Sequence, residues 1–147
     1  MEIILYQPEI AGNVGAIIRL AANSGVSLSL IKPFGFDLQE NKIRRAGLDY
    51  HDLSNTKTYN SWEEFIETNK NKSICCLSSK GVDSYWDTNL NQYDFLLFGP
   101  ESIGLPDEII SSYKTITIPM KENSRSINLA NSVGIVVFES LRQASVQ

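Results

Sequence analysis

The sequence predicts an α/β fold in which a mainly parallel sheet carries helices on both of its faces. Three short segments, 2–6, 73–78 and 93–98, are apolar nearly throughout. Strands that are apolar on both faces are typical of parallel sheets, because both faces of such sheets are covered. Segments with helical periodicity alternate with these strands along the chain, which is the element order of an α/β protein.

The first half of the chain contains four predicted elements. They are a strand at 2–6, a helix from about 13 to 23, a strand at 27–32 and a short helix at 37–46. Asn13 is a suitable N-cap for the first helix, after a loop at 7–12, and Ser24-Gly25 is a suitable C-terminal stop. The exposed face of the helix at 37–46 is basic.

The second half continues the alternation. The predicted elements are a short strand at 57–59, a helix to about residue 69, strands at 73–78 and 93–98, a helix at 107–112, a strand at 115–118 and a helix at about 128–143. Ser61 and Glu64 form a capping box that begins the first of these helices. Residues 129–138 are apolar almost all the way round the last helix, so we expect it to be buried rather than merely amphipathic.

The bulk properties fit one domain, 1–147, with enough length for a single core. No apolar run reaches the roughly 18 to 20 residues of a membrane helix, and Met1 leads into a strand rather than a signal peptide. We therefore expect a cytoplasmic protein that does not associate with membranes. The net charge of −4 argues against non-specific coating of nucleic acid, although Lys42, Arg44 and Arg45 form a local basic cluster.

The two cysteines, Cys75 and Cys76, are adjacent on a predicted strand. Successive strand residues point to opposite faces, so these two thiols should neither pair nor share a metal. The chain has one histidine and no Cys-x-x-Cys spacing, so we expect no metal site.

Three loops follow predicted strands, after Leu77, Phe98 and Ile118. Ligands of parallel α/β folds bind at the carboxyl edge of the sheet, so we expect these loops to meet there. The sequence has no dinucleotide fingerprint and no phosphate loop. It also has no convincing Ser-His-Asp or Cys-His set, so hydrolytic chemistry is poorly supported.

Three segments are richer in polar, glycine or proline residues than ordinary connections. The first runs from Asn13 to Arg19, and by itself it fits an N-capped helix with a surface arginine. The second, Phe98-Gly-Pro-Glu-Ser-Ile-Gly-Leu-Pro106, fits a turn-rich connection with Glu101 at a strand end. The third, 118–131, fits an elaborate helix cap with several candidate capping side chains.

Taken together, these segments resemble the SPOUT class of RNA methyltransferases, and within it the small tRNA ribose 2′-O-methyltransferases that act on the wobble nucleotide. The pattern Asn13-x-Gly15-x-x-x-Arg19 resembles the first motif of the class, 98–106 the second and 118–131 the third. Residues 44–51 resemble a segment of the small subgroup, and the resemblance covers essentially the whole chain. The sequence departs from the family pattern at three positions, Ile103, Ala130 and Phe138, where a basic residue, a serine and a tyrosine are usual.

The resemblance implies a deep C-terminal trefoil knot, an exception to the usual unknotted topology. It also implies that S-adenosylmethionine is bound in a bent form within the knot. Leu77, Gly99, Ile118 and Ser126 match the cofactor-binding positions. The family forms homodimers through helices that include the first and the last, and each site uses residues of both subunits.

The resemblance places Arg19 at the reacting ribose hydroxyl, supported by Asn13, Glu101, Ser124 and Asn128. Arginine is protonated at every ordinary pH, so we expect Arg19 to orient the hydroxyl or a phosphate rather than act as a base. The candidates for RNA contacts are Arg44, Arg45, Tyr50, His51, Lys80 and Arg125.

The leading hypothesis is S-adenosylmethionine-dependent methylation of the ribose 2′-hydroxyl at the wobble cytidine or modified uridine of leucine tRNAs. The same chemistry at another tRNA position is one alternative. A non-catalytic RNA-binding protein with the same knotted fold is another, although the presence of Arg19 and Glu101 favours catalysis. A flavodoxin-like nucleotide binder is weakened by the missing phosphate loop.

Overall fold

The computed structural model describes residues 1–36 and 56–145, and every structural statement below refers to these. The helix predicted at 37–46 lies outside the described residues. The other elements predicted from the sequence can all be compared with the structure.

The described residues form a seven-stranded sheet in which every pairing is parallel. Its strand order is β3-β2-β1-β6-β4-β7-β5. The strands are β1 (Glu2–Tyr6), β2 (Ser27–Ile31), β3 (Lys57–Tyr59), β4 (Ile74–Leu77), β5 (Asp83–Ser84), β6 (Phe95–Phe98) and β7 (Lys114–Thr117). The predicted fold class is confirmed, and only the two-residue strand β5 had no signal in the sequence.

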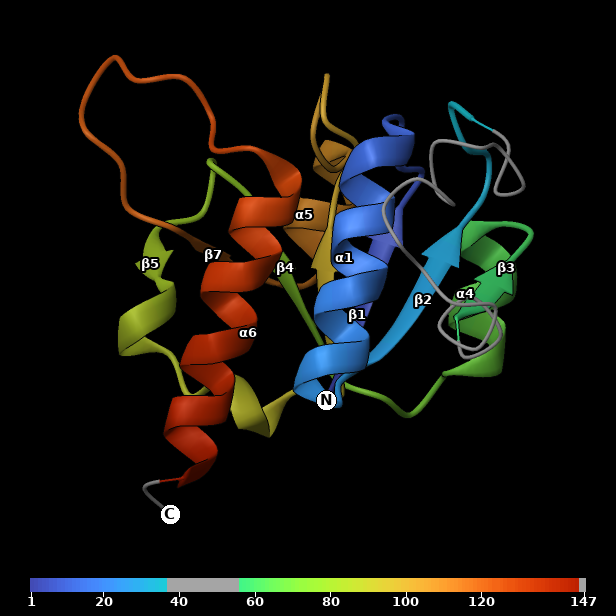
Figure 1. Ribbon diagram of the computed structural model, residues 1–147, viewed down its shortest axis with the longest axis horizontal. Coiled ribbons are helices and arrows are strands. Elements are labelled where there is room, and N and C mark those ends of the chain that lie inside the picture. Colours follow the sequence, from blue (N-terminus) through green and yellow to red (C-terminus); the bar gives the residue numbers. More distant parts are fainter. Residues whose placement is uncertain (37–55, 146–147) are drawn as a thin grey trace.

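Helices cover both faces of this sheet. They are α1 (Ala11–Ser24), α4 (Trp62–Thr68), α5 (Asp107–Ser112) and α6 (Leu129–Ser145), with short 3₁₀ turns η1 (Tyr85–Asp87) and η2 (Leu90–Gln92). Helices α1 and α6 lie side by side on one face (Figure 1). The side chains of α4 and α5 belong to the core on the other face.

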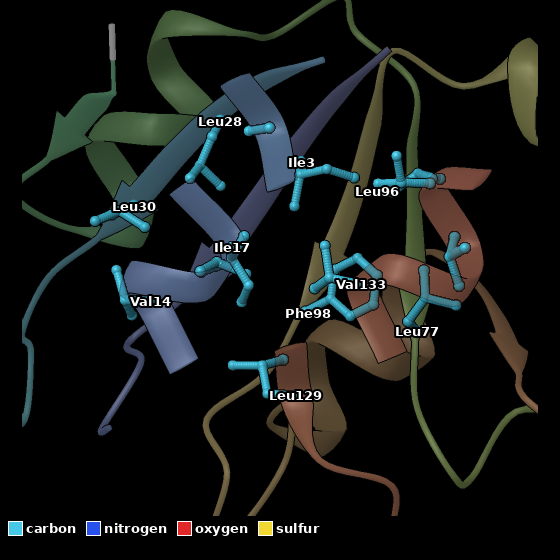
Figure 2. Close-up of a cluster of buried hydrophobic side chains, with 14 of the residues drawn as sticks. Ile3, Val14, Ile17, Leu28, Leu30, Leu77, Leu96, Phe98, Leu129 and Val133 are labelled. Carbon is cyan, nitrogen blue, oxygen red and sulfur yellow. The ribbon is translucent and has the colours of Figure 1, made fainter. Parts of the chain in front are cut away.

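The two cores follow the alternation of side chains along each strand. Ile3 packs with Ile17 of α1 and Val133 of α6 (Figure 2), whereas its neighbour Ile4 packs with Phe65 of α4. A strand buried on both faces must be apolar at every position, which explains the continuous apolar runs in the sequence.

The two cysteines lie in different cores, as the sequence predicts. Cys75 packs with the side chains of α1 and α6, and Cys76 packs with those of α4 and α5. Both are free, and burial raises the pKa of each thiol to about 12. Because the thiolate is the nucleophile, neither cysteine is reactive at neutral pH.

Two local predictions are confirmed in detail. The backbone N–H of Glu64 donates to Ser61 Oγ at 3.2 Å, so Ser61 caps α4. The Glu64 carboxylate accepts from the backbone of Asn60 at 2.6 Å, one residue before the usual partner of a capping box. Gly25 ends α1 with a φ of 74°, a left-handed conformation that glycine adopts at little cost.

Two predictions about helices were wrong. Helix α1 begins at Ala11 after an Ile10 N-cap, so Asn13 is a buried residue of the helix and not its cap. Helix α6 is buried on one face only, because Phe138 remains 58% exposed. The apolar composition of α6 led us to expect that other elements would cover both of its sides. Within the described residues, only one side is covered.

Strand β7 lies between β4 and β5, which are themselves joined by the short segment 78–82. This segment crosses β7 very closely. A Cβ atom on Gly81 would lie 2.4 Å from the carbonyl carbon of Ile116, and the N–H of Ser78 donates to the carbonyl of Ile116 at 3.0 Å. Such interleaving is what a knotted path requires, and the complete trefoil stays a prediction of the family resemblance.

Among the helices in 1–36 and 56–145, none has the length and apolar character needed to cross a membrane.

Candidate functional site

The loops that follow β4, β6 and β7 meet at the carboxyl edge of the sheet, where they enclose a cavity of about 250 Å³. The meeting of these loops confirms the prediction from strand ends. Leu77, Gly99, Ile118 and Ser126, the four predicted cofactor positions, all line the cavity. The other lining residues are Ser78, Ser79, Lys80, Phe98, Pro100, Glu101, Ser102, Ile103, Gly104, Leu105, Thr117, Met120, Ile127, Leu129 and Ser132.

The floor of the cavity is continuous with the hydrophobic core. Leu77, Phe98 and Leu129 line the cavity and also belong to the core cluster under α1 and α6 (Figure 2). Protein cores are close-packed, so these side chains form a rigid apolar surface. The three loops supply the remaining walls, which include both polar side chains such as Ser126 and apolar ones such as Leu105 and Ile118.

Gly99 permits a close approach between two parts of its own loop. A Cβ atom at this position would lie 2.4 Å from the backbone nitrogen of Leu105. Gly99 therefore allows the loop 99–105 to fold back on itself, and Gly104 completes the turn with a φ of 70°. The resulting loop shape forms one side of the cavity.

Glu101 connects this loop to the start of α1. Its carboxylate accepts hydrogen bonds from the backbone N–H of Glu9 at 2.8 Å and of Ile10 at 3.2 Å. It also accepts from Asn13 Nδ2 at 3.0 Å. The Glu101 carboxylate lies beside the N-terminus of α1, where the helix dipole favours a negative charge. Its backbone donors are the two residues just before the helix, so it holds the approach to α1 and does not cap the first turn.

Asn13 passes the connection on to α6. Asn128 Nδ2 donates to Asn13 Oδ1 at 2.9 Å. Asn128 Oδ1 accepts from the backbone N–H of Ala130 at 2.9 Å and of Asn131 at 3.3 Å, which caps α6. A hydrogen-bond chain from Glu101 through Asn13 to Asn128 thus joins the three sequence motifs.

The two functions of Asn128 can be separated by mutation. Asn128→Ala should lower the free energy of unfolding by about 1 kcal/mol, because the cap of α6 is lost. Asn128→Asp retains the capping oxygen but cannot donate to Asn13, so it should melt close to the wild type while losing the methyl transfer that the sequence resemblance predicts. Thermal melting and transfer rate, measured on both variants, check this. Equal activity in Asn128→Asp and the wild type would show that the bond to Asn13 has no functional role.

Two predicted catalytic residues lie apart from this chain of hydrogen bonds. Arg19 is exposed on α1, does not line the cavity, and has no ion-pair or hydrogen-bond partner within the described part of the chain. Ser124 is also exposed, and its Oγ donates to the carbonyl of Lys121 at 2.6 Å within a local turn. Within the described chain, neither residue forms a hydrogen bond or an ion pair with Glu101, Asn13 or Asn128.

The predicted RNA-binding residues are divided between described and undescribed segments. Lys80 lines the cavity, and its Nζ atom lies 2.6 Å from Asp107 Oδ1 in an exposed ion pair. Arg125 is exposed on the loop before α6. Arg44, Arg45, Tyr50 and His51 lie outside the described residues.

The sequence predictions missed Glu9 and Ser102, which bond to each other beside the cavity. No spacing rule identifies such a pair. However, Glu9 follows the first strand and Ser102 follows β6. The rule that ligands of parallel α/β folds bind at the carboxyl ends of strands could therefore have identified both residues as candidates. Among the described residues there is no cluster of three or more His, Cys, Asp or Glu side chains placed to hold a metal ion.

Known proteins resemble this chain over nearly its whole length. The model of the SpoU rRNA Methylase family matches residues 1–138. A relative from Saccharophagus degradans, named tRNA (cytidine(34)-2′-O)-methyltransferase, is 42% identical over 97% of this chain and 94% of its own length. The relative of the same name from Escherichia coli K12 is 40% identical over 97% of this chain and 93% of its own length.

Solved structures agree with these matches. A structure that concerns the 2-OH methylation of C/U34 on tRNA is 39% identical, covers 99% of this chain and 97% of its own, and superposes with a TM-score of 0.92. An AdoMet-bound rRNA methyltransferase from Sinorhizobium meliloti is 25% identical, covers 96% of this chain and 55% of its own, and has a TM-score of 0.85. From the fold, the motifs and these similarities together, the chain belongs to the SpoU rRNA methylase family.

Proposed function

We propose that this protein is an S-adenosylmethionine-dependent RNA methyltransferase that methylates the ribose 2′-hydroxyl of the wobble nucleotide, position 34, in leucine tRNAs. The main supporting observation is the cavity at the carboxyl edge, where the loops of the second and third motifs meet and hydrogen bonds tie them to the first. The full-length similarity to tRNA (cytidine(34)-2′-O)-methyltransferases supports the choice of nucleotide. We propose a cytoplasmic location, because tRNA is the substrate in this assignment.

The residues around the cavity fit S-adenosylmethionine. Leu77, Leu105 and Ile118 offer apolar contact to an adenine ring, and the loops offer backbone groups for hydrogen bonds. A cavity of about 250 Å³ is small for a ligand site. The bent form of the cofactor is what the family resemblance implies. When bound, the cofactor supplies an activated methyl group on a sulfonium centre.

The ribose hydroxyl must attack that methyl group in line and lose its proton, so orientation of the substrate is the main task of the protein. Glu101 is poorly suited to be the proton acceptor, because three donors from residues 9–13 already occupy its carboxylate. We assign it to holding the loop 99–105 and the start of α1. Among residues 1–36 and 56–145, Arg19 has no such partner, so we assign its guanidinium to binding the ribose or the adjacent phosphate.

We further propose that the enzyme is a homodimer with shared sites. Arg19 does not line the cavity of its own chain, and Phe138 on the adjacent helix α6 is 58% exposed. Packing of α1 and α6 against a second copy would cover Phe138 and bring Arg19 near a partner site. Sedimentation velocity tests this proposal, and a monomer with full activity would exclude it.

The activity test uses undermodified total tRNA and methyl-labelled S-adenosylmethionine, followed by nucleoside mapping. We expect label on the 2′-oxygen of nucleotide 34 in leucine tRNAs. Label at another nucleotide would retain the chemistry and overturn the substrate assignment. Binding of cofactor and tRNA without any transfer would instead favour the non-catalytic RNA-binding alternative.

A further inference from the structure

Glu9 lies outside the cavity lining, but its side chain holds a residue that lines it. The backbone N–H of Ser102 donates to Glu9 Oε2 at 2.8 Å, and Ser102 Oγ donates to Glu9 Oε1 at 2.7 Å. Both carboxylate oxygens are therefore engaged by one residue. Hydrogen bonds to an ionised acceptor are stronger than neutral ones, and two of them fix orientation as well as distance.

The contact is reciprocal. While Glu9 accepts from Ser102, the preceding residue Glu101 accepts from the backbone N–H of Glu9 at 2.8 Å. Each carboxylate thus bonds to the backbone of the segment that carries the other. The two acidic side chains lie near each other, and each of their four carboxylate oxygens accepts at least one hydrogen bond.

The segment that carries Glu9 is itself firmly supported. The N–H of Gln7 donates to the carbonyl of Ile31 at 2.9 Å, and the N–H of Gly35 donates to the carbonyl of Pro8 at 3.1 Å. A Cβ atom on Gly35 would lie 2.7 Å from the Glu9 carbonyl oxygen, so the two backbones are in close contact. Glu9 therefore provides a fixed point against which another loop can be positioned.

The loop 99–105 depends on this point. Its base is packed into the core through Leu105, which is 3% exposed, whereas Ile103 at its tip is 80% exposed. Within the described residues, the hydrogen bonds from 101 and 102 to other segments all go to residues 9–13. Removing the Glu9 carboxylate leaves only the Glu101 contacts to hold the tip.

We infer that Glu9 is a positioning residue for the cofactor: through Ser102 it holds the loop 99–105 in the shape that forms one wall of the cavity. The inference rests on the proposed function, because it takes S-adenosylmethionine as the ligand. Glu9 itself touches neither cofactor nor substrate in this assignment. Its loss should weaken cofactor binding and leave the transfer step unaffected once cofactor is saturating.

The test compares Glu9→Ala, Glu9→Gln and Ser102→Ala with the wild type. Calorimetry should show an increase of about tenfold in the Kd for S-adenosylmethionine for Glu9→Ala. For Glu9→Gln the Kd should rise less, about threefold, because the amide oxygen can still accept one of the two hydrogen bonds from Ser102. The kcat at saturating cofactor should stay within about twofold of the wild type. Combining Glu9→Ala with Ser102→Ala should add little, because both act through one contact.

A purely structural role would give a different result. Glu9→Ala would then lower the melting temperature while the Kd and the KM for cofactor stayed unchanged, and this outcome would overturn the inference. Glu67→Ala is the matched control, because Glu67 is an exposed glutamate on α4 whose partner is Lys70. It should leave the Kd for cofactor unchanged.

A second readout separates this inference from the proposed function. Hydrogen exchange at the Ser102 amide should be faster in Glu9→Ala than in the wild type, whether or not a cofactor binds. If the wild type fails to bind S-adenosylmethionine, the proposed function falls, and with it the cofactor role of Glu9. If the wild type binds but exchange at Ser102 is unchanged in Glu9→Ala, only the inference about Glu9 falls.

Discussion

Replacement of Arg19 by alanine is expected to lower kcat for methyl transfer at least about 100-fold, because we propose that this arginine orients the reacting ribose. Cofactor affinity should remain nearly unchanged. Arg19 is exposed, does not line the cavity and holds no other residue through an ion pair or hydrogen bond within the described residues. Stability should also be preserved, since no buried contact is removed. Single-turnover kinetics and cofactor titration on the same preparation measure both effects.

Two further variants sharpen this experiment. Arg19→Lys keeps the charge but loses the planar fork of donors, so it should recover only part of the activity if bidentate contact matters. Lys70→Ala removes an exposed cation just after α4 whose partner is Glu67, away from α1 and α6, and it should transfer methyl groups at the wild-type rate. A large loss of cofactor affinity in Arg19→Ala would contradict the assignment of this side chain to the RNA substrate.

Replacement of Gly99 by alanine is expected to damage the site through the backbone. The new Cβ atom would lie 2.4 Å from the nitrogen of Leu105 and 2.6 Å from the carbonyl carbon of Gly104. Backbone atoms cannot move aside as a flexible side chain can, so the loop 99–105 must shift. We expect a loss of about 2 kcal/mol in the free energy of unfolding, which is typical of an overpacked site. The Kd for S-adenosylmethionine should rise at least about tenfold.

Gly12→Ala provides the control for a glycine replacement as such. A Cβ atom at Gly12 has no neighbour within 4 Å, and the residue lies within α1. Alanine favours the helix more than glycine does, so the melting temperature should be unchanged or higher. If Gly99→Ala bound cofactor with the wild-type Kd, the loop 99–105 would not be the wall that we propose.

Local sequence signals determined most of the secondary structure. The apolar runs around Ile3, Cys75 and Leu96 predicted buried parallel strands, because only a sheet covered on both faces buries every side chain of a strand. The capping box at Ser61 and the stop at Gly25 depend on contacts within a few residues, so they too could be recognised in the sequence. The positions of the strand ends then predicted that the loops after Leu77, Phe98 and Ile118 would meet at the carboxyl edge of the sheet.

Long-range partners explain the predictions that failed. Asn13 has the chemistry of an N-cap, but its side chain bonds to Glu101 and Asn128, which are 88 and 115 residues away. The Glu101 carboxylate holds the two residues that precede the helix. Nothing local to α1 could reveal these partners. For α6 the composition indicated burial, but the described chain supplies only one of the surfaces required, so Phe138 is exposed.

The sequence by itself determined the α/β class, the order of most elements, the family and the three loops of the cavity. Those properties follow from local periodicity, from turn chemistry and from motif order. Only the tertiary structure decided what the polar residues of the motifs do: Glu101 holds the start of α1, Asn128 both caps α6 and binds Asn13, and Gly99 makes room for Leu105. The cap of α6 and the contact of Gly99 with Leu105 are local, but the sequence offered several capping candidates and did not indicate the path of the loop 99–105. The contacts of Glu101 and the bond from Asn128 to Asn13 join segments far apart in the chain, and residue spacing carries no record of such distances.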